Sequence, residues 1–219
     1  HRDLHLSIRR QRQMCIRDRY WNEGKLTREI IKDYAEQYYQ HVKAFPRYIS
    51  ATHSICEDIE KRRILLENLQ DEENKDGDHP KLWKNFAKSV GADDAEIENV
   101  KLDWFTKDMI DNFFSQARKS YAEGLASLYT YERQIPEIAE TKINGLKKFY
   151  GVSSKEGLEF FEAHKSADVI HRAECEKLLD NLSKDEQEKA EVSSLLTARY
   201  LWNFLSGISS KHKLHSIAA

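Results

Sequence analysis

The fold of this chain is decided by the stretch His164-Lys-Ser-Ala-Asp-Val-Ile-His171, in which three polar residues recur at helical spacing. Each residue of an α-helix turns the chain by about 100°, so positions four and seven residues apart return to nearly the same side. His164, Asp168 and His171 would therefore project from one face of a helix. Imidazole nitrogens and carboxylate oxygens are ligands of transition metals. The stretch predicts a helix that carries one half of a metal site.

The composition favours long amphipathic helices over a sheet with many turns. Among the 219 residues there are only 3 Pro and 8 Gly, while 33% are charged and 11% are aromatic. A chain of this length can bury one sizeable core, so we expect a single domain. Helical periodicity without alternating strand patterns predicts an all-α fold.

Net charge and hydropathy argue against nucleic-acid and membrane partners, and the cysteines indicate the redox environment. The formal net charge is −2, which gives no global field to attract nucleic acid or an anionic membrane. No apolar run approaches the roughly 18 residues of a transmembrane helix, so no membrane partner is expected. The three cysteines, Cys15, Cys56 and Cys175, form no Cys-x-x-Cys pair, which indicates a reduced, cytoplasmic protein.

Residues 1–19 do not share the pattern of the rest of the chain. They carry six arginines and no clear apolar stripe. Residues 10–19 resemble translated sequencing-adapter read-through, so we interpret 1–19 as a non-native or disordered basic segment. A basic targeting arm is the alternative, although no signal-peptide apolar region accompanies it. We expect residues 20–209 to form one helical domain and residues 210–219 to form a polar C-terminal tail.

From residue 20 onwards, apolar residues recur at helical spacing and turn formers separate the runs. Thr27 is expected to cap the first long helix, which Pro46 should break or bend before a second helix runs through Ile49. Residues 74–80 should interrupt a helix, and the acidic residues 92–101 should form a connector. Seven or eight helices are expected in all. Capping boxes mark the starts of the last two: Ser153 with Glu156, and Ser183 with Glu186.

Three residues far from the opening stretch are candidates to complete its metal site. Glu72 and His79 stand seven residues apart around an Asp-Gly turn, and Glu132 lies in an otherwise apolar stretch. Asp71 and Glu73 are close rivals of Glu72. Three histidines and three carboxylates suit two first-row metals such as iron or manganese, with open positions for oxygen. The predicted ligands are Glu72, His79, Glu132, His164, Asp168 and His171.

The metal interpretation has a plain alternative. Each of these residues, taken alone, is more often solvated or hydrogen-bonded within a protein than bound to a metal. The ferritin type of di-iron bundle places Glu-x-x-His pairs on two helices, and this chain has no such pair. An ordinary ferritin-like bundle is therefore disfavoured.

Four segments closely resemble the family of the Chlamydia protein associating with death domains: residues 39–46, 66–73, 131–138 and 164–171. That family belongs to the haem-oxygenase-like superfamily, beside thiaminase II and pyrroloquinoline-quinone synthase. The resemblance implies an all-α, up-down bundle of about seven helices with a di-metal oxidase centre. It also implies para-aminobenzoate formation for folate biosynthesis, with two iron ions or an iron–manganese pair, molecular oxygen and an external reductant. A homodimer is compatible with it.

The family's six metal ligands carry over onto the six predicted ligands without substitution. Its route is self-sacrificing: a protein tyrosine supplies the aromatic ring, and a lysine, here Lys142, is implicated as the amino donor. The tyrosine position, three residues before Trp21, holds Asp18, and Tyr20 is out of register. Either the tyrosine was lost with the true N-terminus, or this chain cannot perform the tyrosine chemistry. Tyr131 matches a second family tyrosine and is interpreted either as a relay for an electron or radical, or as a packed core aromatic.

Two other classes of function remain open. One is a metal-independent enzyme of the thiaminase II or quinone-synthase type. Thiaminase II needs a nucleophilic cysteine in its pocket, and neither Cys56 nor Cys175 lies in residues 129–136, where that family places it. The other is a non-catalytic helical bundle that binds other helical domains. It predicts no retained metal and tolerance to changes of His164 or His171.

Overall fold

The computed structural model describes residues 20–214, and for residues 166–171 it describes the backbone alone. Within this range all regular structure is helical and no strand is present, which confirms the all-α prediction. The predicted basic segment at 1–19 lies outside the described residues. From Arg28 onwards the helices are α3 (Arg28–Ser54), α4 (Ile59–Glu72), α5 (His79–Ser89), α6 (Asp94–Asn99), α7 (Trp104–Lys119), α8 (Tyr121–Glu132), α9 (Ile135–Phe149), α10 (Lys155–Asp180) and α11 (Lys184–Lys211).

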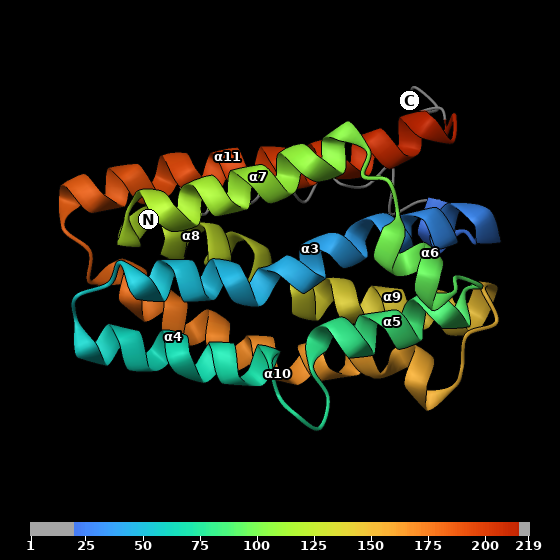
Figure 1. Cartoon of the computed structure of the whole chain (residues 1–219), viewed down its shortest axis with the longest axis horizontal. Helices are drawn as coiled ribbons and strands as arrows, with labels where there is room; N and C mark the ends of the chain where they lie inside the picture. The colour runs from blue at the N-terminus through green and yellow to red at the C-terminus, as the bar shows by residue number, and fades with distance from the viewer. Residues whose placement is uncertain (1–19, 215–219) are drawn as a thin grey trace.

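The long helices run along the long axis of one bundle (Figure 1). Helix α11 packs on α7 and α8, α10 packs on α5, α8 and α9, and α3 packs on α4, α5 and α7. Along one edge, α4 and α5 follow each other on either side of a short loop (Figure 1). Helices α8 and α9 are likewise separated by a break of only two residues, 133 and 134. Both interruptions place helix ends beside α10: His79 at the start of α5 faces His164, and Arg172 of α10 donates to the Arg133 carbonyl between α8 and α9.

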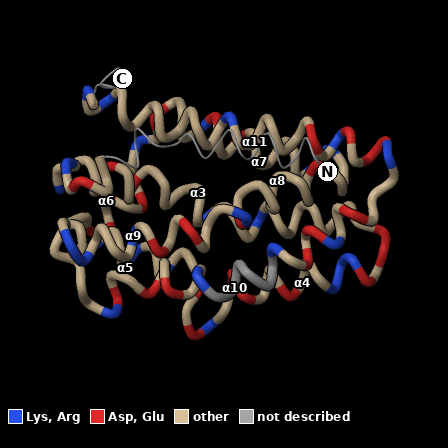
Figure 2. Tube along the Cα trace, turned by 180° about the vertical axis from the view of Figure 1, so that it is seen from behind, with Lys and Arg blue, Asp and Glu red and all other residues tan. Residues whose placement is uncertain are grey.

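Charged residues of both signs are interspersed along the outer faces of the bundle (Figure 2). This mixture agrees with the formal net charge of −2. Within the described part of the chain, none of the helices combines the length and the apolar character that a bilayer crossing requires.

Side-chain caps set the helix starts, with one difference from the prediction. Thr27 caps α3, and the box that begins α11 is present as predicted. Helix α10 begins one residue later than expected, because Ser154 accepts a hydrogen bond from the Gly157 amide. The predicted box of Ser153 with Glu156 is therefore wrong. Two adjacent serines offer the same capping group, and the second of them is the cap.

Helix α3 continues through Pro46, so the predicted break is wrong. A proline inside a helix costs about 3 kcal/mol or more. The flanking side chains of Phe45, Tyr48 and Ile49 are all buried. Burial of such a side chain contributes about 1.5–3 kcal/mol, so the three together outweigh the cost of the proline. The second helix expected through Ile49 is consequently the second half of α3.

The other two departures concern segments expected to be irregular. The predicted connector at 92–101 contains the short helix α6, which begins with a capping box of Asp93 and Glu96 and buries Ile97. At the C-terminal end, α11 runs through Lys211, two residues past the expected domain end at 209. His212 Nε2 then lies 2.7 Å from Asp33 Oδ2 on α3. Tertiary contacts therefore order part of what looked like a polar tail.

Gly145 on α9 makes room for an aromatic side chain from the start of the described chain. The Trp21 indole donates a hydrogen bond to the Thr141 carbonyl over 3.1 Å. A Cβ added at Gly145 would stand 2.1 Å from Trp21 Nε1. The indole lies directly on the backbone of α9 only because residue 145 has no side chain.

Gly145→Ala is expected to lower the free energy of unfolding by about 1 kcal/mol or more. An overlap at 2.1 Å belongs at the upper end of the about 1–3 kcal/mol that overpacking costs, and the better helix propensity of Ala recovers up to about 1 kcal/mol of that. Urea unfolding of the variant measures the change. Gly77→Ala is the matched control, since its nearest neighbour, Leu82 Cδ2, would lie 3.7 Å from the added Cβ. Equal stability of wild type and Gly145→Ala would contradict the close approach.

Candidate metal centre

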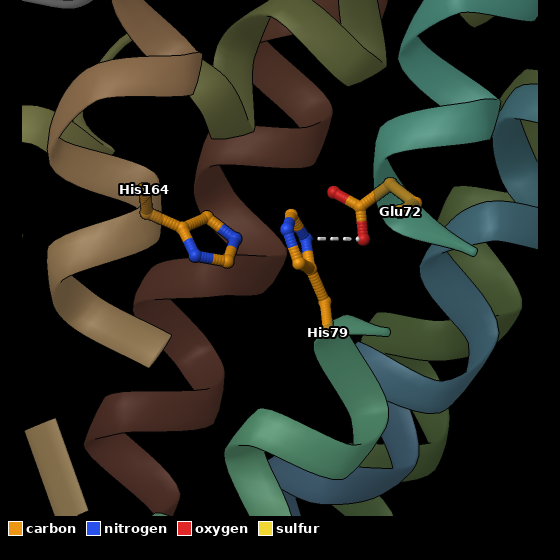
Figure 3. A group of neighbouring side chains, drawn as sticks. All are labelled: Glu72, His79 and His164. Atoms are coloured by element: carbon orange, nitrogen blue, oxygen red, sulfur yellow. Dashed lines mark ion pairs between the residues drawn. The ribbon is translucent and has the colours of Figure 1, made fainter. Parts of the chain in front are cut away.

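Three of the predicted ligands meet where two helix ends face the middle of a third helix. Glu72 is the last residue of α4, His79 is the first residue of α5, and His164 lies on α10. Each offers one ligand atom, and these atoms all lie within 4.8 Å of one another. Figure 3 shows the Glu72 carboxylate and the His164 ring on opposite sides of the His79 ring. The short turn between α4 and α5 is what brings Glu72 next to His79.

Glu72 and His79 are in contact without forming a hydrogen bond. His79 Nδ1 lies 2.8 Å from Glu72 Oε2. Even so, the direction of the ring N–H leaves Nδ1 without a hydrogen-bond partner among the described residues. Two ligand atoms of one metal ion stand about 3 Å apart, because each bond to the metal is about 2.0–2.2 Å long. The pair therefore has the spacing of two ligands that share a cation.

The interior around these groups is closed to water. Glu72, His79 and His164 are only 4%, 5% and 2% exposed. Burial lowers the pKa of His79, but the neighbouring carboxylates of Glu72, Asp71 and Asp78 raise it, and the net pKa is raised. A buried carboxylate and two buried imidazoles cost free energy unless each is paired. A bound cation would satisfy all three, so the residues present fit a metal ion.

His164 is held in the orientation that metal binding requires. Its Nδ1 lies 2.7 Å from the Phe160 carbonyl oxygen, one helical turn earlier on α10. A carbonyl oxygen only accepts, so Nδ1 carries the proton and Nε2 keeps its lone pair. Metal-ligating histidines commonly donate their second ring N–H in this way.

Glu132 lies outside the three-residue group but is held by Asn68 of α4, the helix that ends at Glu72. It is the last residue of α8, it is buried, and its Oε1 accepts a hydrogen bond from Asn68 Nδ2 over 2.7 Å. Its other oxygen accepts from the Cys175 thiol over 3.7 Å. Asn68 was not predicted, although it stands four residues before Glu72 and therefore on the same face of α4. Both of these groups donate to Glu132 and hold its carboxylate in place.

The remaining two predicted ligands fall on residues whose side chains are not described. Asp168 and His171 are part of the α10 backbone, four and seven residues after His164. Their role as ligands stays a prediction.

An apolar cavity of about 170 Å³ lies beside the metal centre. Its walls come from α3, α5, α8, α9, α10 and α11, and Tyr131 and Lys142 are both among the lining residues. An engineered apolar cavity of about 150 Å³ is large enough to bind benzene. The cavity therefore has the size and the character to hold one aromatic ring.

Lys142 is a cation among aromatic rings. Its Nζ lies 3.7 Å from the centroid of the Trp21 ring and 5.2 Å from that of Tyr34. Both distances are within the range of cation–π attraction. From sequence alone this residue would be taken for a surface lysine, yet the structure turns its amine onto the wall of the cavity.

The sequence position of Tyr131 allowed two interpretations, a relay or a packed core aromatic. Its ring is buried against His41, Phe45 and Phe113, with centroids 5.0, 4.7 and 6.3 Å away. It also lines the cavity. Tyr131 is therefore a packed core aromatic, and its role as a relay stays a prediction.

His41, next to Tyr131, is a buried neutral histidine. Among the described residues neither of its ring nitrogens has a hydrogen-bond partner, and burial lowers its pKa from 6.5 to about 3. A histidine with a depressed pKa contributes stability that is fully present above its unfolded pKa. That stability is lost as the pH falls from 6.5 towards 3, because only the unfolded chain takes up the proton.

Metal-free protein is expected to lose stability through His41 by about 1.4 kcal/mol per pH unit below its unfolded pKa. Urea unfolding of wild type and His41→Leu, at about pH 7.5 and about pH 5.5, isolates this effect. Wild type should lose about 1.4 kcal/mol more than the variant between the two conditions. An identical pH dependence of the two proteins would show that His41 is not held neutral.

Comparison with known proteins agrees with this geometry. A family described as iron-containing redox enzymes matches residues 32–202. The 4-aminobenzoate synthase of Chlamydia trachomatis is 41% identical over 186 residues, which cover 84% of this chain and 80% of that protein. The 4-aminobenzoate synthase of Nitrosomonas europaea is 37% identical over 204 residues, which cover 88% of this chain and 83% of that protein.

A solved structure shares the fold at low sequence identity. A domain of unknown function with a haem-oxygenase-like fold from Shewanella denitrificans superposes with a TM-score of 0.82. It is 13% identical, and the match covers 100% of this chain and 94% of that one. The predicted haem-oxygenase-like architecture is confirmed by this match.

Proposed function

Because the chain belongs to the family of iron-containing redox enzymes, we propose that it is a di-metal oxidase that forms 4-aminobenzoate. The observation that carries the proposal is the buried group of Glu72, His79 and His164, whose ligand atoms lie within 4.8 Å of one another. Curated relatives named 4-aminobenzoate synthase at 41% and 37% identity support the product.

Four described residues would hold the metals, and two more are proposed from the sequence. Glu72, His79 and His164 supply one carboxylate and two imidazoles, and Glu132 supplies a second carboxylate held by Asn68. The two sequence-derived ligands are Asp168 and His171. Two iron ions, or an iron and a manganese ion, when bound there with an external reductant, would supply activation of molecular oxygen.

The protein's own residues would confine the aromatic chemistry to the cavity. Its walls are mainly apolar, and its size fits one ring. The Lys142 amine lies at this wall and is proposed as the nitrogen donor. The ring would come from a tyrosine of the chain or from a free phenol. Residue 18, where the family's route places its tyrosine, is Asp in this chain.

The cysteine chemistry of a thiaminase II finds little support in the cavity. Cys56 and Cys175 are both buried, and neither belongs to the residues that line the cavity. Burial also raises the pKa of the Cys56 thiol, which disfavours a nucleophilic thiolate.

Product analysis tests the proposal. Purified protein would be loaded with ferrous iron, alone or with manganese, under anaerobic conditions, and then given oxygen and a chemical reductant. Mass spectrometry of the small-molecule fraction should show 4-aminobenzoate, and protein kept anaerobic should form none. Parallel reactions with and without free tyrosine would identify the source of the ring. Retained metal with no product under either condition would contradict the assigned product, and no retained metal would contradict the oxidase.

A further inference from the structure

A wall of aromatic side chains stands between the cavity and His164 of the metal centre. Glu72, His79, Glu132 and His164 are not among the residues that line the cavity. Phe160 and Trp83 do line it. The centroid of the Phe160 ring lies 4.1 Å from that of His164. On the side of His164, a ring held in the cavity would therefore face Phe160 and Trp83.

We propose that Trp83 is a redox-active residue that passes electrons from the aromatic group in the cavity to the metal centre. This inference rests on the proposed function, because molecular oxygen, the co-substrate of the proposed oxidase, would be the final electron acceptor. Direct attack on the cavity-held ring would require contact with the metals, and none of the four described ligands lines the cavity. Transfer of electrons through the wall requires only a chain of close rings.

The rings around Trp83 form such a chain. On the side of the metal centre, Trp83 meets Phe160 edge-to-face, with centroids 4.7 Å apart and an interplanar angle of 85°. On the side of the cavity, its centroid lies 5.0 Å from that of Tyr38 and 5.9 Å from that of Tyr34. Trp83 is thus the indole that touches both the ring packed on His164 and the tyrosines of the cavity wall.

The hydrogen bond of the Trp83 indole determines whether the residue passes an electron alone or an electron together with a proton. Its Nε1–H donates to the Ala35 carbonyl oxygen over 2.7 Å, in the buried core. A backbone carbonyl is not basic enough to remove this proton. One electron therefore leaves the indole towards oxygen reduced at the metal centre, and one electron from the cavity-held phenol restores it. The phenol is oxidised and releases its proton to solvent, oxygen is reduced, and Trp83 ends unchanged.

Tyr131 is less suited to this role, although it also lines the cavity. Its ring packs on His41, Phe45 and Phe113, whereas Trp83 meets Phe160 directly. Oxidation of a phenol also requires that its hydroxyl proton leave, whereas an indole can pass an electron and keep its proton. The path through Trp83 is therefore the simpler one for electrons alone.

Two substitutions of Trp83 test the relay. Trp83→Phe keeps an apolar ring but removes the oxidisable group, and Trp83→Tyr restores an oxidisable ring. Trp104→Phe is the matched control, because Trp104 is 67% exposed and is not a lining residue. Each protein would be loaded with ferrous iron, checked for metal content and helical circular dichroism, mixed with oxygen and frozen within milliseconds. Electron paramagnetic resonance then detects organic radicals, and growth on ring-deuterated tryptophan identifies those located on indole.

We expect wild type and Trp104→Phe to show a radical signal that changes on tryptophan deuteration. Trp83→Phe should lack that signal at unchanged metal content. Its product formation should fall by at least about tenfold, equivalent to a barrier higher by about 1.4 kcal/mol. Trp83→Tyr should recover part of the rate. A merely structural role would instead leave both variants equally impaired.

The outcomes separate the relay from the proposed function. The relay alone is overturned if wild-type protein is metal-loaded and active, Trp83→Phe is equally active, and neither protein shows a deuterium-sensitive signal. Wild-type protein that retains no metal, or that binds metal but neither consumes oxygen nor forms product, overturns the proposed function and the relay with it. If Trp83→Phe does not fold, wild type and Trp83→Tyr decide. A deuterium-sensitive signal that is present in wild type and absent in Trp83→Tyr supports the relay. The same signal in both proteins, or in neither, overturns it.

Discussion

His164→Ala should empty the metal centre and abolish 4-aminobenzoate formation. The imidazole is buried, its Nδ1–H is fixed on the Phe160 carbonyl, and its ring faces His79 at a centroid distance of 4.3 Å. Loss of residues that merely support a ligand already costs about 10–100-fold in metal affinity, so loss of the ligand should cost at least about 100-fold. Mass spectrometry of metals in the purified, iron-loaded protein measures the effect.

His53→Ala is the matched control for His164→Ala. His53 lies in the last turn of α3, is only partly buried and is not a member of the three-residue group. It should leave metal content unchanged. A His164→Ala protein that retains wild-type metal content would show that the three residues form an ordinary buried polar cluster.

Replacement of Lys142 should stop product formation without emptying the metal centre. Lys142→Met keeps the length of the side chain and removes its amine, and Lys142→Arg keeps the charge over Trp21 and Tyr34 but lacks a primary amine. Both should bind metals as wild type does and form no 4-aminobenzoate. Product from wild-type protein grown on heavy-nitrogen lysine should carry the label.

The neighbouring exposed residue Lys148 provides the control, because Lys148→Arg changes the same helix outside the cavity. It should form product at the wild-type level. Unlabelled product from labelled protein, or full product from Lys142→Met, would mean that the nitrogen comes from elsewhere and that Lys142 acts at most through its charge.

Local features of the sequence predicted most of the fold, and long-range packing explains the exceptions. The caps at Thr27 and Ser183 depend on residues only three positions away, so they could be read directly. The effect of Pro46 could not be read directly, because the helix continues past the proline through burial of side chains against α4, α5 and α7. The choice of Ser154 over Ser153 could not be read either, because the adjacent serines offer the same capping group.

In the candidate site too, local sequence predicted some features and long-range packing set the others. Spacing and residue type placed Glu72, His79 and His164 among the ligands, and the structure brings those three together. The hydrogen bond from Asn68 to Glu132 joins residues 64 positions apart, and the indole of Trp21 reaches α9 across 120 positions. Neither contact has a local signature. The cavity, which depends on six helices at once, was therefore beyond prediction from spacing.

The central claim is that the described ligands bind a pair of metals, and anomalous X-ray diffraction from crystals of iron-loaded protein tests it most directly. Data collected at the iron absorption edge should show two peaks about 3.5–4 Å apart, the usual separation in two-metal sites. Both should lie between His79, His164 and the carboxylates of Glu72 and Glu132. A single peak, or peaks elsewhere on the molecule, would contradict the account.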